Sequence, residues 1–209
     1  MAPATELQQE VSVSPRVVAH GERVWLRLLE PSDRSALRRW ANDAFLERMA
    51  GSEFLRAYRR AEAPPSFLDA CLADPTQVIF IVTAAEEDGE PLGLVRLFNI
   101  HRRESYAFLE TIIADRKALG KGCGVEAGKL ICAWGLDVLT LERIEAKVYE
   151  YNALSINALK RNGFQQEGVL RKAGYQAGRR CDVLIFGILR EELEARRQQE
   201  AHPERFCFA

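Results

Sequence analysis

The sequence lacks several features that would direct the chain out of the cytoplasm or provide a metal site. It contains no run of about 18 apolar residues, and residues 1–10 carry acidic and polar side chains where a signal peptide needs an apolar stretch. Its 3 histidines and 5 cysteines are scattered, without a C-x-x-C spacing, which argues against zinc and against a disulfide framework. We therefore expect a cytoplasmic protein that holds no metal.

The sequence also lacks an excess of charge of one sign. Its 29 basic and 30 acidic residues give a formal net charge of -1 at pH 7. No overall field then draws the chain to nucleic acid or to an anionic membrane, so we expect neither as a partner. Any site for an anion must be built locally.

What the sequence does contain is enough apolar material for one domain. The chain has 209 residues, 47% of them hydrophobic, and can bury a core of ordinary size. Residues 1–22 are polar and contain proline, which predicts an N-terminal extension. The folded domain is expected at 23–195 and a C-terminal tail at 196–209.

Hydrophobic periodicity predicts about seven strands, at 24–30, 77–85, 93–99, 106–114, 143–152, 164–172 and 180–189. Helices are expected at 31–42, 66–73, 124–138, 153–162 and 191–200, with a further helical piece inside 43–65. Glu126 is expected on the outward face of the helix at 124–138. Two hairpins followed by a strand, loop, helix and strand predict a mixed, mostly antiparallel α/β sheet with flanking helices.

Three glycines at every second position mark residues 119–126, L-G-K-G-C-G-V-E. Gly120, Gly122 and Gly124 let successive backbone N–H groups turn toward one point, and the following helix adds its positive N-terminal end. The pattern predicts a phosphate site, and its alternative is a tight connection without a ligand. A dinucleotide-binding fold is not expected, because that fold needs several alternating parallel units.

Three segments carry a family resemblance: I-I-A-D at 112–115, G-K-G-C-G-V-E-A at 120–127, and N-A-L-S-I-N-A-L-K-R-N-G-F-Q-Q-E-G at 152–168. Together they resemble the GNAT superfamily of acetyl-CoA-dependent N-acetyltransferases. Within it, they are most similar to the branch of ribosomal-protein N-terminal acetyltransferases and spermidine acetyltransferases. The resemblance covers about 24–192 and is strongest from 106 to 170.

The resemblance implies acetyl-CoA as the acyl donor. The loop at 119–125 would bind the pyrophosphate through backbone N–H groups, and the pantetheine arm would lie between two splayed strands, 106–114 and 143–152. Leu119 departs from the family pattern, which usually has Arg or Gln there, and Lys121 is expected to supply the missing charge. The implied cofactor-binding residues are Ile112, Ile113, Ala114, Leu119, Gly120, Lys121, Gly122, Cys123, Gly124, Val125, Asn152, Ser155, Asn157 and Lys160.

The second motif carries one candidate for catalysis. In related enzymes the serine that matches Ser155 lies near the thioester sulfur, although a serine in the first turn of a helix is commonly only structural. Asn152 is either a helix N-cap or a contact of the pantetheine amide. Many superfamily members have a tyrosine acid one turn later, where this sequence has Leu159.

Transfer to an amine needs a proton acceptor, because an amine attacks a thioester only when it is neutral. Glu110 is the best candidate, since strand alternation places it with Phe108 and Ile112, where burial favours proton uptake. Cys123 lies in the phosphate loop and is a poor candidate for a nucleophile. The rivals to Glu110 are Glu145, Glu150 and Glu167, and the alternative hydroxyl donors are Tyr149 and Tyr151.

The resemblance implies transfer of an acetyl group to a primary amine by direct attack in a ternary complex. The acceptor is a protein N-terminus or a small molecule such as a polyamine, an amino sugar or an antibiotic. Arginines in 43–75 and 170–180 argue mildly against a spermidine-like acceptor. The alternatives are an acyl-CoA-binding module without catalysis, which Leu119 and Leu159 would suit, and a structural module with an empty loop. The sequence leaves a homodimer open.

Overall fold

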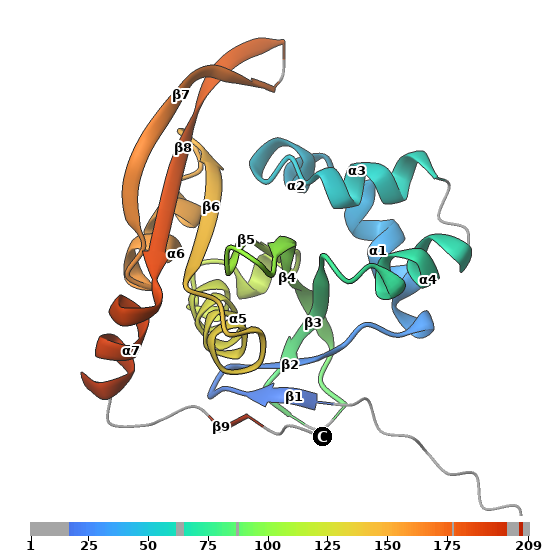
Figure 1. Cartoon of the computed structure of the whole chain (residues 1–209). Coiled ribbons are helices and arrows are strands. Elements are labelled where there is room, and N and C mark those ends of the chain that lie inside the picture. The colour runs from blue at the N-terminus through green and yellow to red at the C-terminus, as the bar shows by residue number, and fades with distance from the viewer. Residues whose placement is uncertain (1–16, 62–64, 87, 177, 200–204, 207–209) are drawn as a thin grey trace, which may run out of the picture.

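The computed structural model describes residues 17–61, 65–86, 88–176, 178–199 and 205–206. They form one sheet of nine strands in the order β7-β8-β6-β5-β4-β3-β2-β1-β9, with helices on both faces (Figure 1). The strands are β1 (Val17–His20), β2 (Val24–Leu28), β3 (Val78–Ala84), β4 (Pro91–His101), β5 (Tyr106–Ile113), β6 (Arg143–Tyr149), β7 (Gln165–Gln176), β8 (Arg179–Leu189) and β9 (Arg205–Phe206).

Seven α-helices and two short 3-10 turns connect the strands of the described chain. The helices are α1 (Arg34–Ala41), α2 (Ala44–Met49), α3 (Glu53–Arg60), α4 (Pro65–Ala73), α5 (Cys123–Leu139), α6 (Ala153–Arg161) and α7 (Arg190–Gln199). The 3-10 turns are η1 (Pro31–Asp33) and η2 (Arg116–Ala118). No helix in the described ranges is both long and apolar enough to cross a membrane.

The predicted fold class is confirmed, because every strand pairing within the described residues is antiparallel except that of β5 with β6. The expected number of about seven strands is too low. The two additional strands are β1, which lies inside the segment predicted as a polar extension, and β9, which lies in the predicted tail. Both are short, and β1 pairs with β2 and with β9. Residues 1–16 lie outside the described chain.

Two hydrophobic clusters cover the two faces of the sheet. On one face, alternate strand residues such as Phe80, Val95 and Leu109 pack against Leu130 and Ile131 of α5. On the other face, the cluster joins strand residues with α1, α3 and α4 and contains Leu37, Trp40, Phe54, Tyr58, Leu68, Ile79, Ile81, Leu94 and Ile112. Burial of each such large apolar side chain contributes roughly 2 kcal/mol. The alternation of side chains along each strand therefore supplies both cores.

Strands β5 and β6 pair over only part of their length. Their parallel pairing joins Tyr106 to Arg143, Ala107 to Ile144 and Phe108 to Glu145, and stops there. Strand β5 runs on to Ile113 and β6 to Tyr149, so their carboxyl ends separate. The sheet thus contains the splayed strand pair that the family resemblance implies.

The position of Glu126 corrects an expectation. Its side chain, only 14% exposed, does not face solvent. Its carboxylate instead accepts hydrogen bonds from the backbone N–H groups of Glu22, Arg23 and Val24 at 3.1, 2.7 and 2.8 Å. Periodicity placed Glu126 outside the apolar stripe of α5 correctly, but it did not reveal that the β1–β2 turn covers that part of the helix.

Candidate active site

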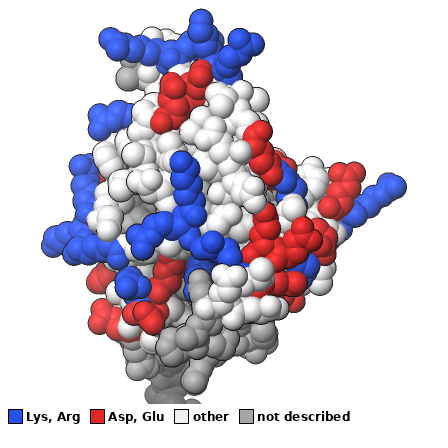
Figure 2. All heavy atoms as spheres, turned by 90° about the vertical axis from the view of Figure 1, so that its left-hand side faces the viewer, with Lys and Arg blue, Asp and Glu red and all other residues white. Residues whose placement is uncertain are grey.

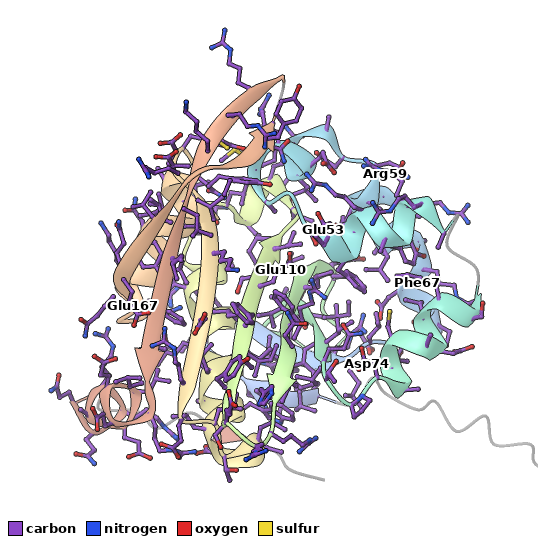
Figure 3. All side chains as sticks on the ribbon, turned by 45° about the horizontal axis from the view of Figure 1, so that its top comes forward. Glu53, Arg59, Phe67, Asp74, Glu110 and Glu167 are labelled. Carbon is purple, nitrogen blue, oxygen red and sulfur yellow. The ribbon has the colours of Figure 1, made fainter. Side chains whose placement is uncertain are left out.

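A cleft of about 810 Å³ opens where β5 and β6 separate. This volume falls within the range of ligand pockets, roughly 300–1,000 Å³. The walls come from α2, α3, β4, β5, β6, the loop before α5, α6 and the β7–β8 hairpin. Figure 3 shows Glu53 of α3 and Glu110 of β5, which both line this opening.

One end of the cleft is the glycine loop. Gly120 and Gly122 have φ angles of +74° and +91°, which favour glycine, and α5 begins immediately afterwards at Cys123. Within the described chain, no hydrogen-bond acceptor is found for the backbone N–H groups of Gly120, Gly122, Gly124 and Val125. The first N–H groups of a helix have no partner inside the helix. The loop therefore offers several free donors and a helix N-terminus to an anion.

The side chains of the glycine loop lie in different environments. Leu119 packs against the core and also lines the cleft. Lys121 is exposed and does not belong to the lining. Cys123 is buried, and this burial raises the pKa of its thiol. A buried, protonated thiol is a poor nucleophile, so the geometry agrees with a structural role for Cys123.

The free edge of β5 forms the next part of the cleft. The N–H group of Ala114 donates to the Leu92 carbonyl at 2.7 Å and is therefore occupied. Opposite residues of an antiparallel pair alternate between bonded and unbonded, so the same register bonds Ile112 to β4. Thr111 and Ile113 then direct their backbone groups toward β6, from which β5 has separated. This edge can accept an extended ligand as an additional strand.

Asn152 is the N-cap of α6. Its Oδ1 accepts from the Ser155 N–H at 3.1 Å, and its Nδ2 donates to the Met49 carbonyl at 2.9 Å. The residue is 5% exposed, and both polar atoms of its side chain have partners inside the protein. The cap therefore also ties the start of α6 to the end of α2, and it places the Ser155 side chain on the wall of the cleft.

The two tyrosines at the end of β6 are stacked, with ring centroids 5.5 Å apart, but only Tyr149 lines the cleft. The hydroxyl of Tyr149 accepts from Gln176 Nε2 at 3.1 Å. The hydroxyl of Tyr151 donates to the Arg48 carbonyl at 2.7 Å, and desolvation of this hydroxyl raises its pKa to about 12, although 40% of the residue is exposed. Tyr151 thus stays protonated at neutral pH and fastens α2, while Tyr149 remains available to the cleft.

Of the four carboxylates considered as a base, only Glu110 lines the cleft. Its Oε2 accepts from Arg96 Nε at 2.6 Å, and Arg96 is 7% exposed. Strand β5 places Glu110 on the α3 side of the sheet, as the alternation predicts. The others pair elsewhere: Glu145 and Glu167 bond to Arg143, and Glu150 accepts from the Asp182 N–H. Figure 3 shows Glu167 on the outer part of β7.

Residues 23–165 match the family model described as the acetyltransferase (GNAT) domain. The chain belongs to this family. An N-acetyltransferase 9-like protein of Caenorhabditis briggsae is 32% identical over 146 residues, which span 66% of this chain and 72% of that relative. The match confirms the predicted family and places this GNAT protein among N-acetyltransferase enzymes.

Solved structures agree with the fold of this GNAT chain. Spermidine N-acetyltransferase from Vibrio cholerae, in complex with CoA and spermine, has a TM-score of 0.75 at 23% identity and covers 83% of this chain and 99% of that chain. Mycobacterium smegmatis RimJ, in complex with CoA-disulfide, has a TM-score of 0.69 at 25% identity, and the match covers 93% of this chain and 95% of that chain.

The cleft of this GNAT chain brings together most of the residues expected to bind the cofactor. Those in the lining are Ile112, Ile113, Leu119, Gly120, Gly122, Gly124, Val125, Asn152, Ser155 and Asn157. Four expected residues do not line it, namely Ala114, Lys121, Cys123 and Lys160. Lys121 and Lys160 are exposed, so the lysine expected to replace the missing charge at Leu119 lies outside the lining.

Several lining residues were not expected from the sequence. Asn162 ends α6 and donates from Nδ2 to the Val125 carbonyl at 3.0 Å, which joins α6 to the first turn of α5. Glu53, Arg96 and Lys147 also line the cleft. Lys147 alternates with the inward-facing residues of its strand, so its position on the open face of the strand could be predicted from the sequence. The pairing of Arg96 with Glu110 could not be predicted, because it depends on the β4–β5 register.

Proposed function

We propose that the protein transfers an acetyl group from acetyl-CoA to the primary amine of an acceptor, by direct attack in a ternary complex. One observation carries the proposal. A single cleft contains the free N–H groups of the glycine loop, the open edge of β5 and the carboxylate of Glu110. Donor and acceptor could thus occupy the same cleft from two ends, so no covalent enzyme intermediate is needed.

The residues present fit coenzyme A. The loop at 119–125 would hold the pyrophosphate through its backbone N–H groups, and Arg161, which also lines the cleft, would add a positive charge. The close approach at Gly124 supports this, because a Cβ there would lie 3.3 Å from Ile113 Cγ1, inside the space between loop and strand. The backbone of Thr111 and Ile113 would pair with the pantetheine arm.

Acetyl-CoA, when bound, supplies the acetyl group as a thioester. An alkylamine has a pKa near ~10, so most of it is protonated at neutral pH and must lose a proton before it attacks. We assign the acceptance of this proton to Glu110, directly or through a water molecule. The Ser155 hydroxyl would donate a hydrogen bond to the departing sulfur, and Tyr149 is the alternative donor on the same wall.

An acceptor screen tests the proposal most directly. The protein is mixed with acetyl-CoA and a panel of amines and N-terminal peptides, and release of free thiol is measured. Release that depends on an amine supports acetyl transfer and identifies the acceptor class. No release with any amine, together with a thermal shift on addition of coenzyme A, would instead support a binding module without catalysis. That alternative draws on Leu159, a largely buried residue where many relatives have a tyrosine.

A further inference from the structure

The carboxylates that line the cleft are paired with arginines, whereas some of the lining cations have no carboxylate partner among the described residues. Among the described residues, two carboxylates line the cleft, and each already bonds to an arginine: Glu53 to Arg56 at 2.8 Å and Glu110 to Arg96 at 2.6 Å. Arg56 also pairs with Glu47, which lies outside the lining. No described carboxylate of the lining is therefore left without a cationic partner. A polycationic acceptor would have to compete with arginines for these groups.

Lys147, in contrast to these carboxylates, has no partner of opposite charge among the described residues. It lies on β6, beyond the last residue that pairs with β5, and its side chain lines the cleft. Its Nζ lies 5.2 Å from the centroid of the Phe108 ring. Within the described ranges, no carboxylate lies at ion-pairing distance from this ammonium group. Lys147 therefore offers an unused positive charge in the same part of the cleft as Glu110, on the neighbouring strand.

The surroundings of Lys147 suit a short apolar spacer. Phe98 and Phe108 lie with their ring centroids 5.7 Å apart, and both line the cleft together with Tyr149. The other lining cation without an ion-pair partner among the described residues is Arg161 of α6, at the opposite end near Asn162 and the loop. The two free cations are thus separated, one beside the glycine loop and one beside the base.

The tip of the β7–β8 hairpin, next to one wall of the cleft, carries further positive charge. Strand β7 contributes Ala173, Gly174 and Tyr175 to the lining. The end of the β7–β8 hairpin beside them carries the exposed basic residues Arg171, Lys172, Arg179 and Arg180. Figure 2 shows basic side chains gathered at the tip of this projecting end, with a smaller group of acidic side chains directly below them. Such a field repels a cationic ligand and attracts an anionic one.

We infer that the acceptor amine carries a carboxylate group, and that Lys147 binds this carboxylate while the amine faces Glu110. The inference rests on the proposed acetyl transfer and names the acceptor class for it. An acceptor of this kind neutralises Lys147 and leaves both arginine–carboxylate pairs intact. A diamine of the same length would place a second positive charge against Lys147, where like charges repel.

A matched series of four-carbon amines tests the inference. 4-Aminobutyrate, butylamine and putrescine share one amine and differ at the far end, which is negative, neutral and positive. We expect kcat/KM to be highest for 4-aminobutyrate and lowest for putrescine, with about a tenfold difference or more between these two. The difference should shrink as salt is added, because salt screens the charge of Lys147.

Substitution of Lys147 shows whether the charge or the shape of this side chain causes the preference among the acceptors. Lys147→Met should remove the preference within the series, and Lys147→Glu should reverse it in favour of putrescine. Arg103→Met is the matched control, because Arg103 is an exposed cation in the β4–β5 turn and does not line the cleft. It should keep the preference of the parent chain. A merely structural role for Lys147 would lower all three rates together and would overturn the inference.

A second set of acceptors identifies the source of the carboxylate. The dipeptide amides Ala-Glu, Ala-Gln and Ala-Lys place the charge on the second residue of a peptide instead of on a small molecule. Preference for Ala-Glu over Ala-Lys, lost in Lys147→Met, would extend the inference to acidic N-termini. Thiol release that favours putrescine and Ala-Lys would refute the inference but keep acetyl transfer. No release from any of the six acceptors, or from the wider panel, would count against acetyl transfer itself.

Discussion

Individual side chains in the cleft have roles that sequence reasoning could narrow but not assign. For Asn152 the sequence allowed a cap or a contact with the cofactor, and the structure shows the cap together with a bond to the Met49 carbonyl. Glu110 was recognised from alternation, but its partner Arg96 was not. Caps depend on residues three positions apart, whereas cross-strand pairs depend on register.

The hydroxyl of Ser155 provides the first test at this scale. If it stabilises the departing sulfur mainly in the transition state, Ser155→Ala should lower kcat by about tenfold or more, with little change in the KM for acetyl-CoA. Steady-state thiol release measures both constants. Ser32→Ala, on the exposed turn before α1, is the matched control and should behave as the parent chain. An unchanged kcat for Ser155→Ala would remove this hydroxyl from the mechanism.

The carboxylate of Glu110 provides the second test at the scale of single residues. Glu110→Gln keeps an acceptor for Arg96 but loses the ability to take a proton, so kcat should fall by about 100-fold. The melting temperature should also fall, because the largely buried Arg96 loses its charged partner. Glu145→Gln also removes a carboxylate bonded to an arginine, but outside the cleft, and should retain activity. If Glu110→Gln retained kcat, Glu110 would be only the partner of Arg96.

At the scale of elements, the junction of loop and helix is the part that the sequence described best. The glycines at 120 and 122 adopt positive φ angles, and α5 begins one residue later. These properties follow from a few neighbouring residues. The position of Glu126 was missed, because its three N–H donors come from a turn about 100 residues earlier in the chain.

Gly124 allows ligand binding to be separated from folding. Its φ is not positive, and an added Cβ would lie 3.3 Å from Ile113 Cγ1 and 4.0 Å from Thr111 Cγ2, so Gly124→Ala should fold after a small shift of Ile113. The methyl group would narrow the space between loop and strand and should raise the Kd for coenzyme A by about tenfold, or ~1.4 kcal/mol. Isothermal titration calorimetry and thermal melting measure the two effects.

The control for this substitution is Gly178→Ala in the β7–β8 turn. Gly178 has a φ of +79° and no neighbour within 4 Å of an added Cβ, so only backbone strain is introduced. This variant should lose about 1 kcal/mol of stability and keep the Kd of the parent chain. Equal Kd values for Gly124→Ala and the parent chain would contradict the proposed anion site.

At the scale of the whole molecule, the splayed pair divides the sheet into two parts that meet only through the first three residue pairs of β5 and β6. A ligand between the separated ends would join the two parts. Coenzyme A at 100 times its Kd should therefore raise the free energy of unfolding by about 2.7 kcal/mol, if it binds only the folded chain.

Hydrogen exchange locates this effect. With coenzyme A bound, amide exchange should slow in 109–113 and 120–125, where the free N–H groups of β5 and the loop lie. Exchange in β2 and β3, which are fully paired, should not change. Mass spectrometry of peptic peptides measures both regions in one experiment. Uniform slowing over the whole chain, without excess protection at the loop, would contradict the proposed position of the cofactor.

Features that depend on short stretches of chain could be predicted from the sequence: the seven longer strands, the glycine turn and the family motifs. Three features became visible in the folded chain alone: which carboxylate reaches the cleft, the pairing of both lining carboxylates with arginines, and the lack of a carboxylate partner for Lys147 among the described residues. The two groups of features differ in how far apart along the chain the interacting residues lie. Backbone conformation follows from neighbouring residues, whereas charge pairing follows from the register and separation of strands.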